Sequence, residues 1–188
     1  VKPDVKIFAT DIDRGALETA AQGIYPLSIA ADASLDRLGK YFFKKGDGYQ
    51  IQPRIRKQIV FAYHNIIKDP PFPKMDLISC RNLLIYLQGV LQKKVLSNFC
   101  FSLNDNGFLM LGSSESVGEF SKSFSIFSSS WKIHRFVGRN NDLTPALLER
   151  DPVHFTRKPE VIFPSGEIAR EGYDVVLTQI MESCMPPT

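Results

Sequence analysis

Apolar and polar residues are distributed along the chain in short blocks whose periods predict strands and helices in turn. The apolar run over residues 5–10 predicts a strand, and residues 14–22 predict a helix. Asp13 can cap this helix with its side-chain oxygen, and Gly23 is placed to end it. Ser34 can cap a second, short helix in the same way. The chain therefore begins as a strand followed by helices.

The middle of the chain continues this order. Residues 46–51 combine a Gly-Asp-Gly turn with alternating apolar positions and predict a small β excursion. β-rich runs over residues 58–66 and 74–82 predict two more strands. Residues 88–103 show helical spacing up to an Asn-Asp-Asn-Gly stop, and residues 108–112 predict a further strand. This order of strands and helices predicts an α/β fold with a mainly parallel sheet.

The pattern of apolar and polar residues changes in the last part of the chain. Runs over residues 121–127 and 129–138 are expected to pair as an antiparallel hairpin at the sheet edge, with Trp131 packed there. Residues 138–172 mix prolines, charges and isolated apolar positions, which predicts an irregular linker. Residues 173–188 regain helical spacing and predict a connector toward a further domain.

Composition narrows the class of protein. With 188 residues, 44% of them hydrophobic, the chain can bury one good core. The net charge of +3 is too balanced to indicate a nucleic-acid partner. No apolar run approaches the roughly 20 residues that cross a bilayer, so no membrane insertion is expected. The three cysteines show no CxxC spacing, which predicts neither zinc nor disulfides and fits the cytoplasm.

Polar residues stand at the carboxyl ends of three predicted strands: Asp11, Asn65, and the pair Arg81 and Asn82. If the strands are parallel neighbours in one sheet, these residues converge on one crevice, where an acidic strand end typically binds a nucleoside ribose. Each residue alone has an ordinary alternative as a turn residue, a surface ion pair or a helix cap. Together they predict a nucleoside site.

The same segments carry a family resemblance. From about Lys6 to Val137 the chain resembles the S-adenosylmethionine-dependent methyltransferases of bacterial chemotaxis receptors, the CheR family, through the strings FATDIDRGALETAAQGIYP, VFAYHNI, MDLISCRNLLIYL and GFLMLGSSES. The stretch from Cys80 to Tyr86 is the most specific of these. The resemblance implies that residues 1–137 form a partial Rossmann-like class I methyltransferase domain.

The resemblance also implies roles for single residues. Asp11 would hold the ribose hydroxyls, and Ile12, Asn65 and Ile66 would border the adenosine. Arg81 and Asn82 would lie along the methionine side of the cofactor, and Tyr86 would face the methyl group that is transferred. Arg81 and Tyr86 are therefore the candidate catalytic residues. A packing role in the core is the alternative for Tyr86. His64 is expected to be structural rather than a base, and the loop with Glu115 is expected near the substrate entrance.

The family reaction moves the sulfonium methyl to a receptor glutamate, giving a γ-glutamyl methyl ester and S-adenosylhomocysteine. Because a carboxylate is a nucleophile at neutral pH, the reaction needs positioning rather than a strong base. The resemblance implies a bacterial, cytoplasmic protein-glutamate O-methyltransferase whose partner is a methyl-accepting chemotaxis receptor or a related signalling protein. The alternative is a methyltransferase-like scaffold module without catalysis.

Three departures from the family pattern bear on these expectations. Family members carry a first strand and a glycine-rich loop before the matching segments, and no such loop precedes a helix here. The chain alone is therefore expected to be a poor enzyme, and its open strand edges are expected to be covered by self-association, by exchange of elements between copies or by a different packing. The β excursion is short beside those that grip receptor tails. The C-terminal segment resembles the connector to a PAS domain in fused CheB and CheR regulators.

Overall fold

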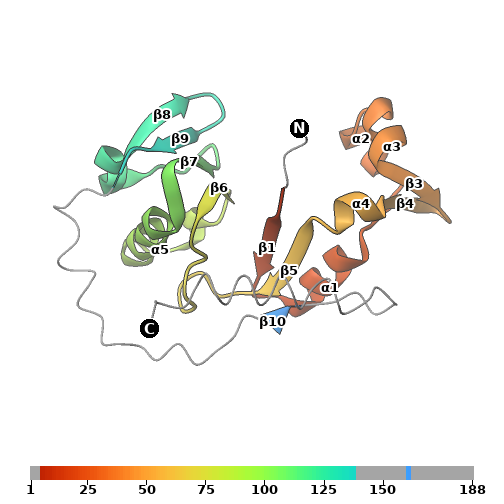
Figure 1. Cartoon of the computed structure of the whole chain (residues 1–188), viewed down its shortest axis with the longest axis horizontal. Coiled ribbons are helices and arrows are strands. Elements are labelled where there is room, and N and C mark those ends of the chain that lie inside the picture. Colours follow the sequence, from red (N-terminus) through yellow and green to blue (C-terminus); the bar gives the residue numbers. More distant parts are fainter. Residues whose placement is uncertain (1–4, 139–159, 162–188) are drawn as a thin grey trace. The chain divides into compact units, whose positions relative to one another are not determined.

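The computed structural model describes residues 5–138 and 160–161, which fall into two units (Figure 1). Within these ranges, the first unit contains residues 5–65 with residues 160–161, and the second contains residues 66–138. Each unit has its own sheets and its own buried cluster. The expected α/β class is confirmed, because each unit joins parallel strands through helices.

The first unit is built on two parallel strands, β1 (Ile7–Asp11) and β5 (Ile59–Tyr63), which lie side by side in Figure 1. The two-residue strand β10 (Glu160–Val161) pairs antiparallel with the other edge of β5. Helix α1 (Arg14–Gln22) begins after Asp13 and ends at Gly23, as the sequence predicts. It buries Leu17 and Ala21 in a small cluster with Phe61 of β5.

The predicted β excursion is present between α1 and β5. Strand β4 (Gly48–Ile51) forms its centre, with β2 (Ile24–Pro26) and β3 (Phe42–Lys45) antiparallel on either side. Three short helices accompany it: α2 (Ile29–Asp32), α3 (Leu35–Tyr41) and α4 (Pro53–Arg56). Ser34 caps α3 as expected, since its hydroxyl accepts from the N–H of Arg37 at 3.4 Å.

The second unit has a four-stranded sheet in the order β6-β7-β9-β8. Strand β6 (Met75–Cys80) runs parallel to β7 (Leu103–Leu111), and α5 (Gly89–Ser102) connects them. Strands β8 (Phe124–Ser128) and β9 (Ile133–Phe136) form the expected antiparallel edge hairpin. Two 3-10 helices, η1 (Leu84–Tyr86) and η2 (Gly118–Ser123), follow β6 and β7.

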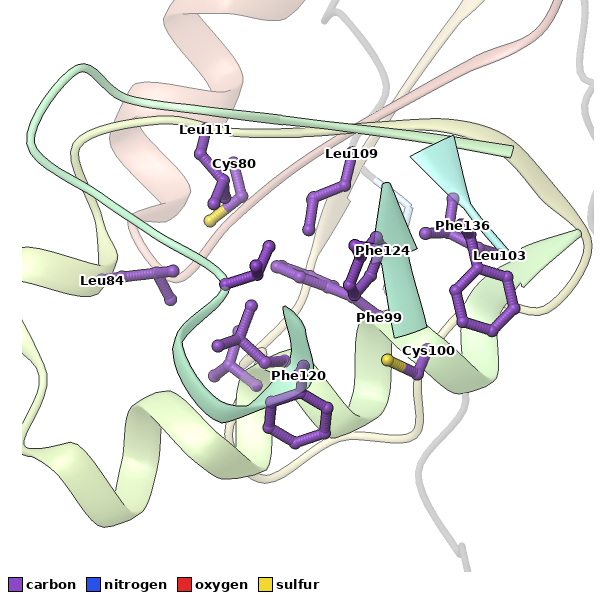
Figure 2. Packing of buried hydrophobic residues seen from close by; sticks show 13 residues of the cluster. Cys80, Leu84, Phe99, Cys100, Leu103, Leu109, Leu111, Phe120, Phe124 and Phe136 are labelled. Carbon is purple, nitrogen blue, oxygen red and sulfur yellow. The ribbon is translucent and has the colours of Figure 1, made fainter. Parts of the chain in front are cut away.

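The core of this unit lies between α5 and the sheet (Figure 2). Helix α5 contributes Val95 and Phe99, and β7 contributes Leu109 and Leu111, all at most 5% exposed. Figure 2 also shows Cys80 beside Leu111, its register partner across β6 and β7. The carboxyl ends of these two strands are therefore anchored on a packed core.

The expectation that β6 shares one parallel sheet with β1 and β5 stays a prediction, because β1 pairs with β5 in the first unit and β6 pairs with β7 in the second. Two other sequence-based expectations are wrong. Trp131 was expected to pack in the edge hairpin, but it is 66% exposed in the turn between β8 and β9. The hairpin contributes Phe124 of β8 and Phe136 of β9 to the core instead. The strand expected to begin at residue 108 begins at Leu103, so that β7 includes residues 104–107. The strand is irregular there: its register with β6 shifts, and Asn106 has a left-handed backbone.

The predicted linker over residues 138–172 and connector over residues 173–188 lie outside the described residues, apart from Gly138 and β10.

Candidate active site

The loop after β1 is held by its own residues. The Oδ1 of Asp11 accepts the backbone N–H of Asp13 at 3.0 Å, and the Oδ1 of Asp13 accepts the N–H of Ala16 at 3.1 Å. The predicted cap is thus confirmed, and Asp11 begins a local turn of its own. All three residues are exposed, so Asp11 presents its carboxylate at the open end of the strand.

Asn65 and Asp11 belong to the same end of the first sheet. Asp11 is the register partner of Tyr63, and the N–H of His64 donates to the carbonyl of Asp11 at 3.0 Å. Asn65 follows directly and is half-buried. Ile12 is 62% exposed. The first unit therefore combines an exposed carboxylate, an amide side chain and an exposed apolar side chain at the carboxyl ends of two parallel strands.

The loop after β6 carries the other predicted site residues. Arg81 and Asn82 are exposed, and Asn82 adopts a left-handed backbone with φ 58°. Leu84 is buried in the core cluster, which anchors η1. Tyr86 is 80% exposed, so within the described residues it does not pack in the core of its own unit.

Glu115 braces this loop from the segment after β7. Glu115 is 4% exposed, and its carboxylate accepts three backbone N–H groups: Asn82 at 3.0 Å, Leu84 at 2.7 Å and Gly112 at 2.6 Å. One carboxylate thus ties together the segments that follow two neighbouring parallel strands. We call this arrangement of Glu115 with the N–H groups of Asn82, Leu84 and Gly112 the Glu115 clamp.

The clamp also sets the ionisation of two buried groups. Burial alone raises the pKa of Glu115, but the three hydrogen bonds of the clamp, together with the nearby backbone N–H of Leu83, outweigh it, so the pKa lies below its ordinary value. Glu115 is therefore a carboxylate at neutral pH. Burial, followed by the negative charge of Glu115, raises the pKa of the Cys80 thiol to about 11.

Gly112 allows the two segments to approach this closely. A Cβ at this position would lie 2.4 Å from the Oδ1 of Asn82, 2.7 Å from the Oε2 of Glu115 and 2.9 Å from the backbone nitrogen of Asn82. Only a residue without a side chain fits there unless the clamp opens. The glycine and the glutamate of the GSSES string thus serve one geometry.

The structure groups the predicted residues by unit. Asp11, Ile12 and Asn65 lie together in the first unit. The second unit contains Ile66 and the loop with Arg81, Asn82 and Tyr86. Ile66 packs against the core of that unit, and its carbonyl accepts the side-chain N–H of Asn98 at 3.2 Å. The bracing role of Glu115 has no local spacing that could have indicated it, because its partner Asn82 is 33 residues away.

Comparison with known proteins shows the family to which the chain belongs. Residues 1–133 match the family described as CheR methyltransferase, SAM binding domain. The chain belongs to the CheR methyltransferase family. Within the part of the chain that the structure describes, there is no cluster of residues suited to a metal and no helix long and apolar enough to cross a membrane.

Relatives of this CheR chain differ widely in size. It is 42% identical over 131 residues to an uncharacterized 104.1 kDa protein of Rhodobacter capsulatus, covering 70% of this chain and 14% of that protein. It is 38% identical over 127 residues to chemotaxis protein methyltransferase 2 of Vibrio cholerae, covering 65% of this chain and 44% of that protein. A chemotaxis protein methyltransferase of Listeria monocytogenes is 36% identical over 111 residues, with 59% and 42% covered. The chain thus spans less than half the length of these relatives.

The cofactor named by the CheR family description suits the exposed groups. S-adenosylmethionine has a ribose diol, an apolar base face and a carboxylate. In the first unit, the exposed Asp11 carboxylate can accept from hydroxyls and the exposed Ile12 side chain can cover an apolar face. In the second unit, the exposed Arg81 guanidinium can bind a carboxylate. Each unit therefore presents groups that suit one part of this cofactor.

Proposed function

We propose that the protein carrying this chain transfers the methyl group of S-adenosylmethionine to glutamate side chains of a chemotaxis receptor or a related signalling protein, with S-adenosylhomocysteine as the second product. The observation that carries the proposal is the loop after β6, which presents Arg81, Asn82 and the 80% exposed Tyr86 on a backbone fixed by a buried carboxylate. Exposed polar side chains on a braced loop are typical of a binding site rather than of packing.

In this proposal different residues contact different parts of the cofactor. Asp11 holds the ribose hydroxyls, while Ile12, Asn65 and Ile66 border the adenosine. Arg81 and Asn82 bind along the methionine side. Support comes from the exposure of Asp11, Ile12 and Arg81; Ile66 is half-buried against the core and offers only an edge.

The chemistry asks little of the protein beyond placement. When bound, the cofactor supplies an electrophilic methyl group on a sulfonium. The glutamate substrate is ionised at neutral pH, so no residue of the chain has to remove a proton, and His64 is not required as a base. Tyr86 orients the incoming carboxylate with its hydroxyl or packs against the methyl group with its ring, while Arg81 holds the methionine side of the cofactor in place beside it.

We further propose that the chain needs additional segments for full activity. Within the described residues β1 and β6 are each paired along one edge only, and an open parallel edge invites another strand. The chain tested alone is expected to self-associate and to bind the cofactor weakly, because a few contacts do not offset the cost of fixing a flexible ligand. The following test therefore uses the full-length protein.

Two substitutions test the assigned roles. Asp11→Ala is expected to weaken cofactor binding by roughly 1.5 to 3 kcal/mol, because a charge-assisted hydrogen bond is lost in ground and transition states alike. Tyr86→Phe is expected to spare affinity and lower turnover, as for a contact made chiefly in the transition state. Calorimetry and single-turnover methyl transfer measure the two effects.

Asp47→Ala, in the exposed β3-β4 turn, and Tyr25→Phe, in β2, are the matched controls and should change neither quantity. Unchanged affinity in Asp11→Ala would contradict the ribose assignment, and unchanged turnover in Tyr86→Phe would return that residue to a passive role. A wild-type protein that binds cofactor and methylates no receptor glutamate would support the scaffold alternative.

A further inference from the structure

We propose that Glu115 is a positioning residue for this methyltransferase, which fixes the loop bearing Arg81, Asn82 and Tyr86 through its three backbone hydrogen bonds. The inference rests on the proposed function of that loop. Glu115 is 4% exposed, and its hydrogen bonds within the described residues go to backbone N–H groups, so it acts on Arg81 and Tyr86 through the backbone of their loop.

The hydrogen-bonding pattern requires a carboxylate. Oε2 accepts from Asn82 and Gly112, and Oε1 accepts from Leu84, so both oxygens face N–H donors. An amide in the same place has one oxygen and one NH₂ group. Whichever way it is turned, at least one backbone N–H loses its acceptor and faces a second donor. Glutamate is thus the only residue of this length that satisfies the clamp.

The clamp fixes a backbone conformation that few residue types adopt. Asn82 has φ 58°, a left-handed conformation that asparagine adopts more readily than most other residues with a side chain. Its N–H is held by Glu115, and Gly112 leaves room for its side chain. Since φ at residue 82 sets the direction of the chain on both sides, the clamp determines where Arg81 and Tyr86 project.

The position of the clamp distinguishes it from general packing. The core beneath it is apolar and is filled from α5, β7 and the edge hairpin, whereas the clamp joins only segments at the carboxyl ends of β6 and β7. In α/β sheets ligands bind outside these ends. Loss of the clamp should therefore disturb the proposed site more than it disturbs the core.

Amide hydrogen exchange tests the clamp without any cofactor. In the wild-type protein the N–H groups of Asn82 and Leu84 should exchange slowly although Asn82 lies in an exposed loop; rapid exchange there would overturn the clamp even if no variant folds. Glu115→Gln should speed exchange at these amides by about 10- to 100-fold, as expected for the loss of a hydrogen bond to a charged group. Glu119→Gln is the control, because Glu119 lies in η2 and forms an exposed ion pair with Lys93, at 2.6 Å.

Binding of S-adenosylhomocysteine and single-turnover methyl transfer then test positioning, well below the unfolding midpoint of each variant. Glu115→Gln should lose about 10-fold in affinity and about 100-fold in turnover relative to Glu119→Gln, as a misplacement near 1 Å does. Equal affinity and turnover in the two folded variants would overturn the proposal and leave Glu115 a stabilising residue. A wild-type protein without methyl transfer would instead contradict the proposed function, which the exchange measurement does not depend on.

Discussion

The two loops that carry the predicted site residues follow parallel strands, yet they are held in different ways. The loop after β1 is organised by neighbours, since Asp11 binds the N–H of Asp13 and Asp13 binds the N–H of Ala16. The loop after β6 is organised from a distance by a buried carboxylate, Glu115. The first loop can form as soon as α1 forms. The second can form only after β7 has paired with β6.

This difference separates local from long-range sources of order. Hydrogen bonds within a few residues survive changes elsewhere in the fold, because they depend only on the turn that contains them. A buried carboxylate with three N–H partners depends on every segment it joins, and breaking it leaves a charge without compensation. The loop after β6 should therefore be the more sensitive of the two.

The largest expected effect comes from Gly112→Ala. The new Cβ would overlap Asn82 and Glu115, so either the clamp opens or the two segments move apart. We expect a loss of about 2 to 3 kcal/mol in the free energy of unfolding, as for overpacking of a buried site. Urea denaturation measures it.

Gly39→Ala is the matched control for this substitution. Gly39 lies inside α3, and a Cβ there would meet nothing within 4 Å. The change should leave stability equal or raise it by up to about 1 kcal/mol, because alanine is the better helix former. Equal stability of the two variants would show that the clamp adapts to a side chain, contrary to the rigidity inferred for the second loop.

A smaller effect is expected in the first loop. Asp13→Ala removes the cap of α1 and should cost about 1 kcal/mol, while Asp13→Ser should recover most of the loss because serine is also a good cap. Thermal unfolding followed by circular dichroism compares the three proteins. A loss as large as that of Gly112→Ala would contradict the distinction between the loops.

This contrast also marks how far the sequence could be interpreted. The caps at Asp13 and Ser34 and the αL ending at Gly23 were predictable, because each depends on residues within four positions. The role of Glu115 was not, since its partners come from a different strand end. The same holds for Trp131, because its apolar character did not decide which residues of the hairpin face the core.

The smallest effect, absent at neutral pH, is a dependence of stability on acid. Burial, followed by the charge of Lys132, lowers the pKa of His134 below its ordinary 6.5. The unfolded state therefore binds a proton at His134 more readily than the folded state does. The free energy of unfolding is unaffected by His134 above pH 6.5 and falls as the pH drops from there toward the pKa of the folded state. The pKa of Glu115 is also lowered in the folded state. Its contribution to the free energy of unfolding is therefore complete above pH 4.5 and is lost as the pH falls from there through the pKa of the folded state.

The two acid-sensitive groups can be separated by substitution. His134→Leu should remove the loss that begins near pH 6.5, and at neutral pH it should cost little, since neither ring nitrogen has a hydrogen-bond partner among the described residues. Glu115→Gln should remove only the loss below pH 4.5. Urea midpoints measured across pH test both; a profile unchanged in His134→Leu would assign the upper step to another group.

Cys80 stands at the start of the most specific string of the chain, yet the structure makes it chemically inert. Burial, followed by the charge of Glu115, raises the pKa of this thiol to about 11, so it stays protonated at neutral pH, and it is the thiolate that oxidants and alkylating reagents attack. Its side chain is also only 6% exposed, against Leu111 of the neighbouring strand. In this fold the sulfur therefore serves as a small apolar group, and oxidative stress should leave the loop that follows it unmodified for as long as the strand stays paired.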